Sequence, residues 1–363
     1  LVAIEPATGG ILALVSKPGY DPNLFVDGID AAAWDALNND PDKPLNNRAV
    51  TGAYPPGSTF KPFMALMALH LGKRSPDYTI SDPGFFTLPG VAHRYRDWKV
   101  GGHGAVNLHR SIVISCDTYY YGVAAETDID QLHAFLSQLG FGQPTGIDID
   151  GEKPGLLPSR EWKRKRFKRP DEQRWYQGDS VSVGIGQGYN LATPLQLAFA
   201  TSIVANDGVV YRPHLVRHVT DAKTGENRAI EPRPIRTVDL NPKWLKLVKG
   251  AMVDVTKPGG TAARAGLNAA YTFAGKTGTA QVIAMKQDTK YDEKKVAERH
   301  RDHSLFIAFA PADAPKIALG ILVENGGHGS ATAAPIARVV LDYYLLGKLP
   351  EKAPEMNPDA QDD

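Results

Sequence analysis

Three short segments of this 363-residue sequence carry side chains that could perform acyl transfer. Ser58 and Lys61 form an S-x-x-K pattern, Ser115 and Asp117 form an S-x-D pattern, and residues 276–279 read Lys-Thr-Gly-Thr. A serine hydroxyl is a poor nucleophile until a neighbouring base takes its proton, and an uncharged lysine amine can be that base. The sequence therefore holds the parts of a serine nucleophile that a lysine activates.

The spacing of the first pattern would place its serine beside its lysine. Residues i and i+3 share one face of a helix, so Lys61 would lie next to Ser58 in a helical segment. Burial, a second cation and the positive end of a helix each lower the pKa of a lysine. Lys61 falls in the first turn of the expected helix, and Lys276 could be the second cation. The N–H groups of the same helix end could stabilise an oxyanion.

Each pattern also has a plain structural interpretation. Ser58 could cap a helix that carries a surface lysine, and residues 276–279 could be an ordinary strand end. The three patterns in this order, each in its expected local context, favour an acyl-serine enzyme. The glycines at 184, 186 and 188 do not indicate a nucleotide-binding loop, because they lack the full G-x-G-x-x-G pattern after a strand.

Composition narrows the class of protein. The 41 Lys and Arg residues against 40 Asp and Glu give a net charge of +1, which argues against a general nucleic-acid-binding protein. The single cysteine, Cys116, excludes an intrachain disulfide scaffold. No apolar run approaches the roughly 20 residues of a membrane helix. Because the sequence opens at Leu1 without an initiator methionine, we expect it to be a piece of a longer protein.

The pattern of apolar residues predicts strands near both ends of the chain around a helical middle. Strands from both termini would build one antiparallel sheet. The expected elements are a hairpin over 1–18, a helix near 31–37, a buried helix from 58 to 72, a helix-rich block over 108–204, a helix opened by the capping box at 193–196, a helix over 242–255, strands over 271–282, 304–310 and 317–323, and a helix over 334–346.

The three patterns, together with longer matches, resemble the transpeptidase domain of class B penicillin-binding proteins, and within that family the rod-elongation subgroup. The set S-x-x-K, S-D-N and K-T-G is characteristic of penicillin-binding serine enzymes. The likeness covers nearly the whole chain. The matching segments are YDPN at 20–23, AYPPGSTFKP at 53–62, ISCDTYYY at 114–121, GIGQGY at 184–189, TPLQLA at 193–198, AGKTGTAQ at 274–281 and ENGGHG at 324–329.

The resemblance implies an α+β fold, a three-layer α/β/α sandwich known as the penicillin-recognising serine transferase fold. This fold has a five-stranded antiparallel sheet flanked by helices and an all-helical subdomain. The domain would span 1–350, with the helical subdomain at roughly 60–270 between sheet strands and a frayed tail at 351–363. A membrane anchor and a pedestal domain would precede it in the full protein.

The resemblance also implies the reaction. Ser58 would attack the carbonyl between the two terminal D-alanines of a peptidoglycan stem peptide, and an amine of a second stem peptide would resolve the acyl-enzyme into a cross-link. β-Lactams would acylate the same serine. Lys61 would be the base, Ser115 would relay a proton, and Lys276 would tune the site electrostatically.

The strand at 276–279 would bind the substrate. Thr277, Gly278 and Thr279 are the implied substrate-binding residues, and the two threonines would hold the substrate carboxylate. The backbone N–H groups of Ser58 and Thr279 would form the oxyanion hole. The resemblance implies no cofactor for catalysis.

Asp117 departs from the asparagine that usually ends the middle motif, although the elongation subgroup resembles this chain in having aspartate. An ionised carboxylate only accepts hydrogen bonds, whereas an amide also donates them. A carboxylate near Lys61 and Lys276 would raise the pKa values of these lysines, which opposes the role of a base.

Two other classes of function remain open. A D,D-carboxypeptidase or a β-lactamase-like hydrolase shares the acylation step, and water replaces the amine in it. A non-catalytic reading is a penicillin-sensing domain or a scaffold of the elongation complex, which would bind β-lactams without turning over a stem peptide.

Cys116 and three upstream residues form a possible structural metal site. Asp82, Asp97, His103 and Cys116 could complete a tetrahedral zinc site, although their spacing matches no standard zinc finger. The alternative is a buried, inert thiol with solvent-facing aspartates. If the backbone around Cys116 is extended, its side chain points away from Ser115 and Asp117. The resemblance to the elongation subgroup implies such a structural metal, which would brace the segment around Ser115.

The basic run at 163–169 has two interpretations. It could contact anionic lipid or glycan-strand carboxylates. A solvated loop balanced by nearby acids is the plainer reading. The resemblance further implies a membrane glycosyltransferase and other elongation-complex proteins as partners, and a location at the periplasmic face of the bacterial inner membrane behind a single-pass anchor. No nucleic acid is implied.

Overall fold

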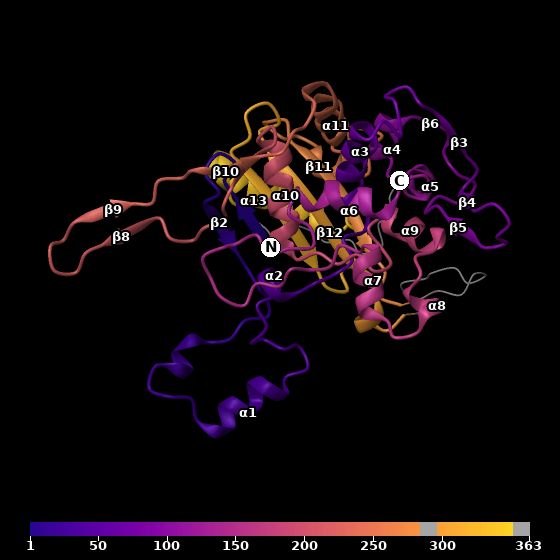
Figure 1. The fold of residues 1–363 in the computed structure, drawn as a ribbon. Coiled ribbons are helices and arrows are strands. Elements are labelled where there is room, and N and C mark those ends of the chain that lie inside the picture. Colours follow the sequence, from indigo (N-terminus) through magenta and orange to yellow (C-terminus); the bar gives the residue numbers. More distant parts are fainter. Residues whose placement is uncertain (284–295, 351–363) are drawn as a thin grey trace.

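The computed structural model describes residues 1–283 and 296–350, and it contains a five-stranded antiparallel sheet built from both ends of the chain (Figure 1). The strand order is β11-β12-β13-β1-β2. The bounds of these strands are Val2–Ile4 for β1, Ile11–Leu14 for β2, Ala274–Ala280 for β11, His303–Ala310 for β12 and Ile317–Val323 for β13. The predicted N-terminal hairpin and the three predicted C-terminal strands are confirmed.

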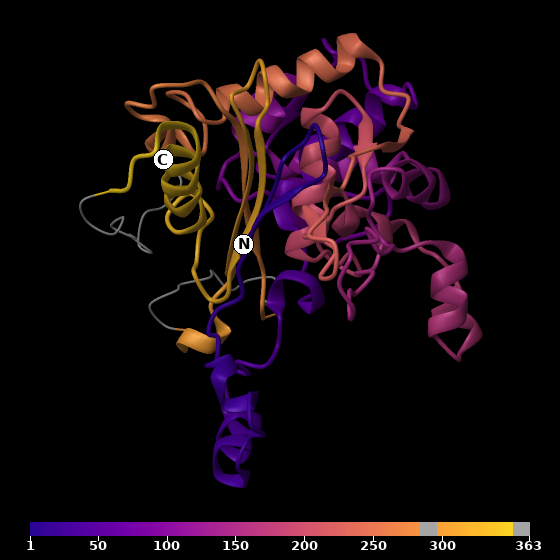
Figure 2. The same cartoon turned by 90° about the vertical axis from the view of Figure 1, so that its left-hand side faces the viewer.

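Strands β12 and β13 are largely buried on both faces, and helices cover both faces of the sheet. Strand β12 is buried in seven of its eight positions, which is typical of a strand covered on two sides. Helix α13 (Ala333–Leu346) packs on one face against β12 and β13, and α10 (Pro194–Ala205) packs on the other against β13 and β1 (Figure 2). The three-layer α/β/α arrangement is therefore confirmed.

Close backbone contact joins α10 to the sheet. A Cβ atom at Gly320 of β13 would lie 2.5 Å from the carbonyl oxygen of Pro194, so only glycine allows this approach. The helix begins as its sequence predicts: Thr193 and Gln196 form a reciprocal capping box, and Pro194 is the first helical residue. All twelve residues of α10 are buried, because sheet and helical block cover it on opposite sides.

The chain between β2 and β11 builds most of the helices and four small two-stranded sheets. The pairs are β3–β6, β4–β5, β7–β10 and β8–β9. The strands are β3 (Ile80–Asp82), β4 (Phe85–Thr87), β5 (Arg94–Arg96), β6 (Gly104–Val106), β7 (Val209–Tyr211), β8 (His218–Thr220), β9 (Asn227–Ala229) and β10 (Pro234–Thr237). The helices are η1 (Pro22–Phe25), α1 (Ala31–Asn39), α2 (Arg48–Thr51), η2 (Gly57–Phe60), α3 (Lys61–His70), α4 (Leu108–Val113), α5 (Asp117–Ala125), α6 (Ile129–Ser137), α7 (Arg160–Arg166), α8 (Pro170–Gln173), α9 (Gln177–Gly184), α11 (Pro242–Asp254) and α12 (Ala263–Gly266), and η4 (Glu298–His300) follows β11.

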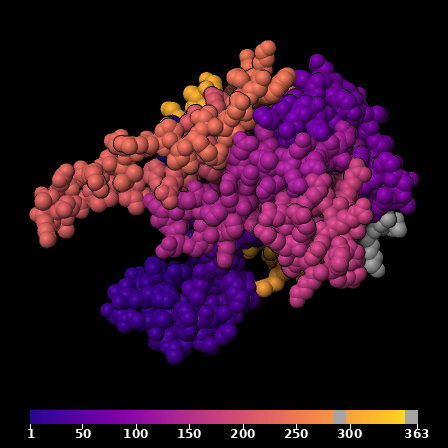
Figure 3. All heavy atoms as spheres, in the orientation of Figure 1, coloured from indigo at the N-terminus to yellow at the C-terminus, as the bar shows by residue number. Residues whose placement is uncertain are grey.

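Two segments project from the body of the molecule. Residues 19–47, with α1, form a lobe below the sheet, and the β8–β9 hairpin forms a long arm to one side (Figures 1 and 3). Within residues 1–283 and 296–350, no helix has the length and apolarity needed to cross a membrane. The predicted subdomain limits at roughly 60–270 stay a prediction, and the predicted tail at 351–363 lies outside the described residues.

Candidate active site

Ser58 lies at the start of a helical segment packed into the core. It belongs to the 3-10 helix η2, which runs directly into α3 at Lys61, so the predicted helix begins with a tighter turn. Pro62 stands in the first turn of α3, where its missing N–H leaves no acceptor unpaired. The rings of Phe60, Phe63 and Phe141 pack edge to face at centroid distances of 5.0 to 6.5 Å and fix this segment.

Lys61 is fully buried and faces the S-x-D motif. Its Nζ atom lies 2.6 Å from the carbonyl oxygen of Ser115, 3.2 Å from the Ser115 hydroxyl and 2.6 Å from Oδ1 of Asp117. Three acceptors thus surround a group that has three donors when it is charged. The first and second motifs, which are far apart in sequence, therefore meet at one lysine.

The S-x-D motif is a junction between two helices, so the expected extended backbone is wrong. Ser115 adopts a left-handed conformation with φ of 59° after α4, and Cys116 is the N-cap residue of α5. The turn nevertheless points the Cys116 side chain away from its two neighbours, as alternation in a strand would. Ser115 and Asp117 face Lys61, while the fully buried Cys116 side chain faces the opposite side.

Burial raises the pKa of the Asp117 carboxyl group above its ordinary value. The nearby Lys61 charge opposes this rise, and the Asp97 carboxylate reinforces it. The backbone N–H of Trp98 donates to the second oxygen of Asp117 at 3.2 Å. Asp117 is therefore a carboxyl group held in place from two sides and more ready than usual to accept a proton.

The third motif lies on the edge strand β11, which packs against η2. A Cβ atom at Gly278 would come within 2.7 Å of Thr59 Cγ2, and a Cβ at Gly57 would come within 2.5 Å of the Thr279 carbonyl oxygen. Both glycines are needed for this close approach, and Gly57 has a positive φ of 53° as well. The Lys-Thr-Gly-Thr strand therefore lies directly beside the residues that flank Ser58.

The side chains of β11 differ in their surroundings. Lys276 is fully buried, and its ammonium group donates to the carbonyl oxygen of Thr277 at 3.1 Å. The Thr277 hydroxyl lies 2.7 Å from the Thr261 hydroxyl, and either can be the donor. Thr279 is only partly buried. The structure thus brings all predicted active-site residues into one region, with Thr279 the most accessible of the strand's hydroxyl groups.

In the described part of the chain, no hydrogen bond involves the Ser58 hydroxyl. Ser58 itself is half-buried, whereas Lys61 is buried, so the hydroxyl is the outer member of the pair. Long or missing contacts between nucleophile and base are common before a substrate binds. Ser58 therefore stands one turn before the buried Lys61, in a segment that packs against the hydroxyl-bearing strand β11.

Two further residues of the site were not singled out from the sequence. Gln187 donates from its side-chain amide to the Thr279 carbonyl oxygen at 3.1 Å, and the Gly186 carbonyl oxygen accepts from Gly57 N–H at 2.9 Å. They belong to the GIGQGY segment, which was matched to the family from the sequence without a role for its residues. A third feature, the hydrogen bond from the Tyr54 hydroxyl to Glu324 at 2.6 Å, had no local sequence signal.

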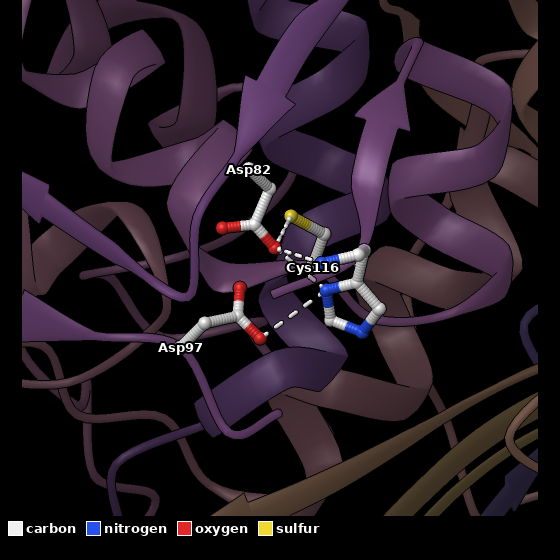
Figure 4. A group of neighbouring side chains, drawn as sticks. Asp82, Asp97 and Cys116 are labelled. Atoms are coloured by element: carbon white, nitrogen blue, oxygen red, sulfur yellow. Dashed lines mark hydrogen bonds and ion pairs between the residues drawn. The ribbon is translucent and has the colours of Figure 1, made fainter. Parts of the chain in front are cut away.

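The four predicted metal-site residues lie together in one cluster, on the side of the turn to which the Cys116 side chain points (Figure 4). One potential ligand atom from each of Asp82, Asp97, His103 and Cys116 lies within 4.8 Å of all the others. The two aspartates and the cysteine are buried, so the alternative of solvent-facing aspartates is wrong. Figure 4 shows both carboxyl groups and the sulfur pointing into the same small space.

The donor set of this cluster fits a divalent cation. His103 Nδ1 lies 2.8 Å from Oδ2 of Asp82 and 3.5 Å from Oδ1 of Asp97. Burial raises the pKa of Asp82, but hydrogen bonds from Gly84 and His103 outweigh it and hold the pKa below the ordinary value. Burial strongly raises the pKa of Cys116. A bound cation would offset the buried negative charge and would favour the thiolate.

Asp97 links this cluster to the S-x-D motif. Its Oδ2 atom accepts hydrogen bonds from the N–H groups of Asp117, at 2.6 Å, and Thr118, at 3.0 Å. These are the first N–H groups of α5, which have no partner within the helix, and a carboxylate there is stabilised by the helix dipole. The Asp97 carboxylate therefore belongs to the candidate metal cluster and also caps the helix end that carries Asp117.

Residues 1–342 match the family model described as the penicillin binding protein transpeptidase domain. The chain belongs to the penicillin-binding protein transpeptidase family. It is 46% identical over 360 residues to the peptidoglycan D,D-transpeptidase MrdA of Escherichia coli K12, an alignment that covers 99% of this chain and 56% of that protein. The chain thus spans about half the length of the curated relatives that it matches.

Solved structures of the same family have the same fold. Pseudomonas aeruginosa PBP2 in complex with WCK 5153 gives a TM-score of 0.84 at 45% identity and covers 98% of this chain and 73% of that one. PBP2 of Helicobacter pylori in complex with MreC gives a TM-score of 0.80 at 34% identity, with 95% and 60% covered. The predicted resemblance to this family is therefore confirmed, and these relatives are penicillin-binding protein 2 structures.

Proposed function

We propose that this chain is the catalytic domain of a peptidoglycan D,D-transpeptidase of cell-wall elongation, and that β-lactams acylate it at Ser58. One observation carries the proposal. Lys61 contacts both Ser115 and Asp117, at 2.6 to 3.2 Å, at the start of a helix that packs against the Lys-Thr-Gly-Thr strand. The similarity to MrdA, which is named as a D,D-transpeptidase, supports the same activity.

The first half-reaction makes an ester at Ser58. Its hydroxyl oxygen bonds to the carbonyl carbon between the two terminal D-alanines, while the uncharged Lys61 amine takes the hydroxyl proton. The C–N bond then breaks, and the departing D-alanine nitrogen receives a proton through the Ser115 hydroxyl. In the second half-reaction, an amine of another stem peptide attacks the ester, and its proton returns to the Ser58 oxygen.

Asp117 prepares Lys61 for this role. The base must be uncharged, and the ammonium form of Lys61 can pass a proton to the carboxylate that lies 2.6 Å away. Burial raises the pKa of Asp117, which makes this carboxylate a better proton acceptor than an exposed aspartate. Asp117 therefore accepts the proton that Lys61 must lose, in addition to its effect of favouring the charged form of Lys61.

The β11 strand and the helix end bind the substrate. Backbone N–H groups of Ser58 and Thr279 form the oxyanion hole. Thr279 and Thr277 hold the substrate carboxylate. Thr277 can donate its hydroxyl hydrogen when it accepts one from Thr261. Gly278 keeps the strand close to η2, and the buried Lys276 adds positive charge near the carboxylate.

The buried cluster would hold a structural zinc ion. A thiolate, an imidazole and two carboxylates are a zinc donor set, and a sulfur ligand disfavours calcium and magnesium. Asp82, Asp97, His103 and Cys116 would hold the ion. The ion would neutralise the cluster's charge and fix Asp97, which in turn orients the start of α5 through two backbone N–H groups.

The whole protein would work at the periplasmic face of the bacterial inner membrane. A membrane anchor, a membrane glycosyltransferase and further elongation-complex proteins follow from the similarity to PBP2, whose Helicobacter pylori member is seen with MreC. These statements concern the full-length protein.

A labelled penicillin tests the proposal and separates it from hydrolysis. The chain should form one stable covalent adduct, and hydrolysis of a chromogenic β-lactam should stop after about one equivalent. Continued hydrolysis would indicate a β-lactamase. Release of D-alanine from a stem-peptide donor, with added amine diverting the acyl group from water, distinguishes a transpeptidase from a carboxypeptidase and from a penicillin sensor.

A further inference from the structure

A cationic surface lies on α7 and the turn that follows it. Residues 160–169 contain seven lysines and arginines and one glutamate, whereas the whole chain has a net charge of only +1. Residues 163–166 belong to helix α7, so the predicted loop is wrong for them, although most of the run is exposed and several of its cations pair with nearby acids, as predicted. In both ribbon views this region stands on the outside of the helical block (Figures 1 and 2).

One member of the basic run points inward. Lys163 is buried, forms an ion pair with Asp179, and lies 5.4 Å from the ring centroid of Trp175 and 5.2 Å from that of Tyr176. A charge-paired lysine among aromatic rings anchors the helix to the segment behind it. Lys163 therefore has a structural role, whereas Arg164, Lys165 and Arg166 of the same helix are exposed.

Three of the outer cations have no acidic partner. Arg164, Arg166 and Lys168 are exposed and form no ion pair within residues 1–283 and 296–350. Their neighbours do: the pairs are Arg160 with Asp128 and Asp130, Lys165 with Glu161, and Arg169 with Asp171 and Glu172. Cations in the last turn of a helix are favoured by its dipole. That effect does not reach Lys168, which lies beyond the end of α7.

The chain connects this surface to the candidate active site. The anchor of Lys163 is Asp179 in α9, and α9 leads into the GIGQGY segment. There the Gly186 carbonyl accepts from Gly57, next to Ser58, and Gln187 donates to the Thr279 carbonyl oxygen. The cationic surface and the nucleophile therefore belong to one continuous, packed unit.

We propose that Arg164, Arg166 and Lys168 form an exosite that binds carboxylates of the peptidoglycan polymer away from Ser58. This inference rests on the proposed function, because it takes the cross-linked polymer as the substrate. Guanidinium groups pair with carboxylates through two parallel hydrogen bonds. A polymer held at the exosite presents its stem peptide to Ser58 at a high effective concentration, because both contacts are then made by one molecule. Weak contacts at the exosite can therefore raise the affinity for that stem peptide.

The charge distribution favours a polymer over a lipid surface. The lobe of residues 19–47 carries six aspartates and one lysine. In Figure 1 this lobe and α8 occupy the lower half of the molecule. A flat anionic bilayer that approached from below would meet the acidic lobe, whereas a single strand can reach α7 without touching it.

Co-sedimentation with purified peptidoglycan sacculi tests the exosite. The triple variant Arg164→Gln, Arg166→Gln, Lys168→Gln should bind sacculi about tenfold more weakly at low salt, since three exposed charge pairs are worth together about 1.4 kcal/mol. The matched control is Lys223→Gln, Arg228→Gln, Arg233→Gln on the exposed β8–β9 arm, which removes the same charge and should bind like the unchanged protein. Sacculi with amidated carboxylates should bind the unchanged protein as weakly as ordinary sacculi bind the α7 variant.

The outcomes separate this proposal from the proposed function. Equal sacculus binding by both variants, whether retained or lost, overturns the exosite. A loss of binding to vesicles of anionic phospholipid, with sacculus binding kept, also overturns it and identifies a membrane contact. Acylation by labelled penicillin should be the same in all three proteins. If the unchanged protein is not acylated, the proposed function fails, whatever its sacculus binding.

Discussion

The ammonium nitrogen of Lys61 lies 2.6 Å from Oδ1 of Asp117, in a pair in which the lysine side chain is fully buried. Removing one member of such a pair is destabilising, because it leaves the other charge buried without a partner. Here the carboxyl group also accepts from Trp98 N–H, and the lysine also donates to Ser115. The pair therefore connects the S-x-x-K helix to the S-x-D turn and sets the charge behind Ser58.

Asp117→Asn should slow acylation by a β-lactam. The amide keeps an oxygen for Lys61 but cannot take its proton, so the rate should fall by about 100-fold, within the range for loss of a proton-transfer group. Stopped-flow or labelled-penicillin kinetics measure the rate. Glu161→Gln is the control, because Glu161 is an exposed carboxylate on α7 whose partner Lys165 is also exposed. Unchanged acylation of the Asn variant at every pH would rule out the proton role of Asp117.

Gly278→Ala should disrupt the contact between β11 and η2. The added Cβ would lie 2.7 Å from Thr59 Cγ2, and relieving this overlap should cost about 1–3 kcal/mol of unfolding free energy. Because the strand must move away from the nucleophile, acylation should slow as well. Urea unfolding and acylation kinetics measure the two effects.

Gly250→Ala is the matched control for that change. Gly250 lies in α11, and no heavy atom stands within 4 Å of its added Cβ, so the variant should be neutral or stabilised by about 0.5–1 kcal/mol. Normal stability and normal acylation in Gly278→Ala would contradict the close packing of the third motif.

Purified protein that has not met a chelator should contain about one equivalent of zinc, and elemental analysis by mass spectrometry measures it. Chelation should lower the unfolding free energy by about 3 kcal/mol if zinc was present at a hundred times its Kd. Cys116→Ser should abolish the zinc content and remove the effect of the chelator. A metal-free protein whose thermal unfolding does not respond to zinc would end the metal proposal.

Glu324 should make a pH-dependent contribution to stability. Burial raises its pKa, but hydrogen bonds from Tyr54 and Arg48 outweigh burial and hold the pKa below its ordinary value of 4.5. A carboxyl group with a depressed pKa stabilises the fold fully above the unfolded pKa and loses this effect as the pH falls through the folded one. The stability gap between the protein and Glu324→Gln should therefore be full near neutral pH and close below about pH 4.5.

Tyr54→Phe should give a smaller loss at neutral pH, about 0.5–1.5 kcal/mol, because it removes one hydrogen bond and leaves the Arg48 pair. Denaturant unfolding at several pH values measures both variants. A Glu324→Gln gap that widened in acid would contradict the assignment.

Elements with strong local signals could be predicted from the sequence. Strand Ile317–Val323 is apolar throughout and matches its predicted limits, and Thr193 and Gln196 mark the start of α10 through their capping box. The three motifs and the metal-like cluster were also found, because reactive residue types are few and their patterns are short. The contact between Lys61 and Ser115 followed from these motifs once the fold was assumed to bring the two segments together.

The remaining features depend on tertiary contacts that no local pattern contains. The backbone at Cys116 turns between two helices because Ser115 takes a left-handed conformation, and serine has no particular preference for it. The inward position of Lys163 depends on Asp179 and a group of aromatic rings, a contact made across the fold, although the helix itself has local signals in its N-cap Ser159 and its Glu161–Lys165 pair. The pair of Tyr54 and Glu324 joins residues 270 positions apart.

Peptide mapping after exposure to an isotopically labelled β-lactam tests the central claim most directly. Mass spectrometry of the intact chain should show one added ligand mass, and the digest should place it on the peptide that contains Ser58. Ser58→Ala should show no adduct, and a Lys61→Ala variant should show adduct only after far longer exposure. An adduct on another residue, or equally fast labelling of Ser58→Ala, would contradict the account.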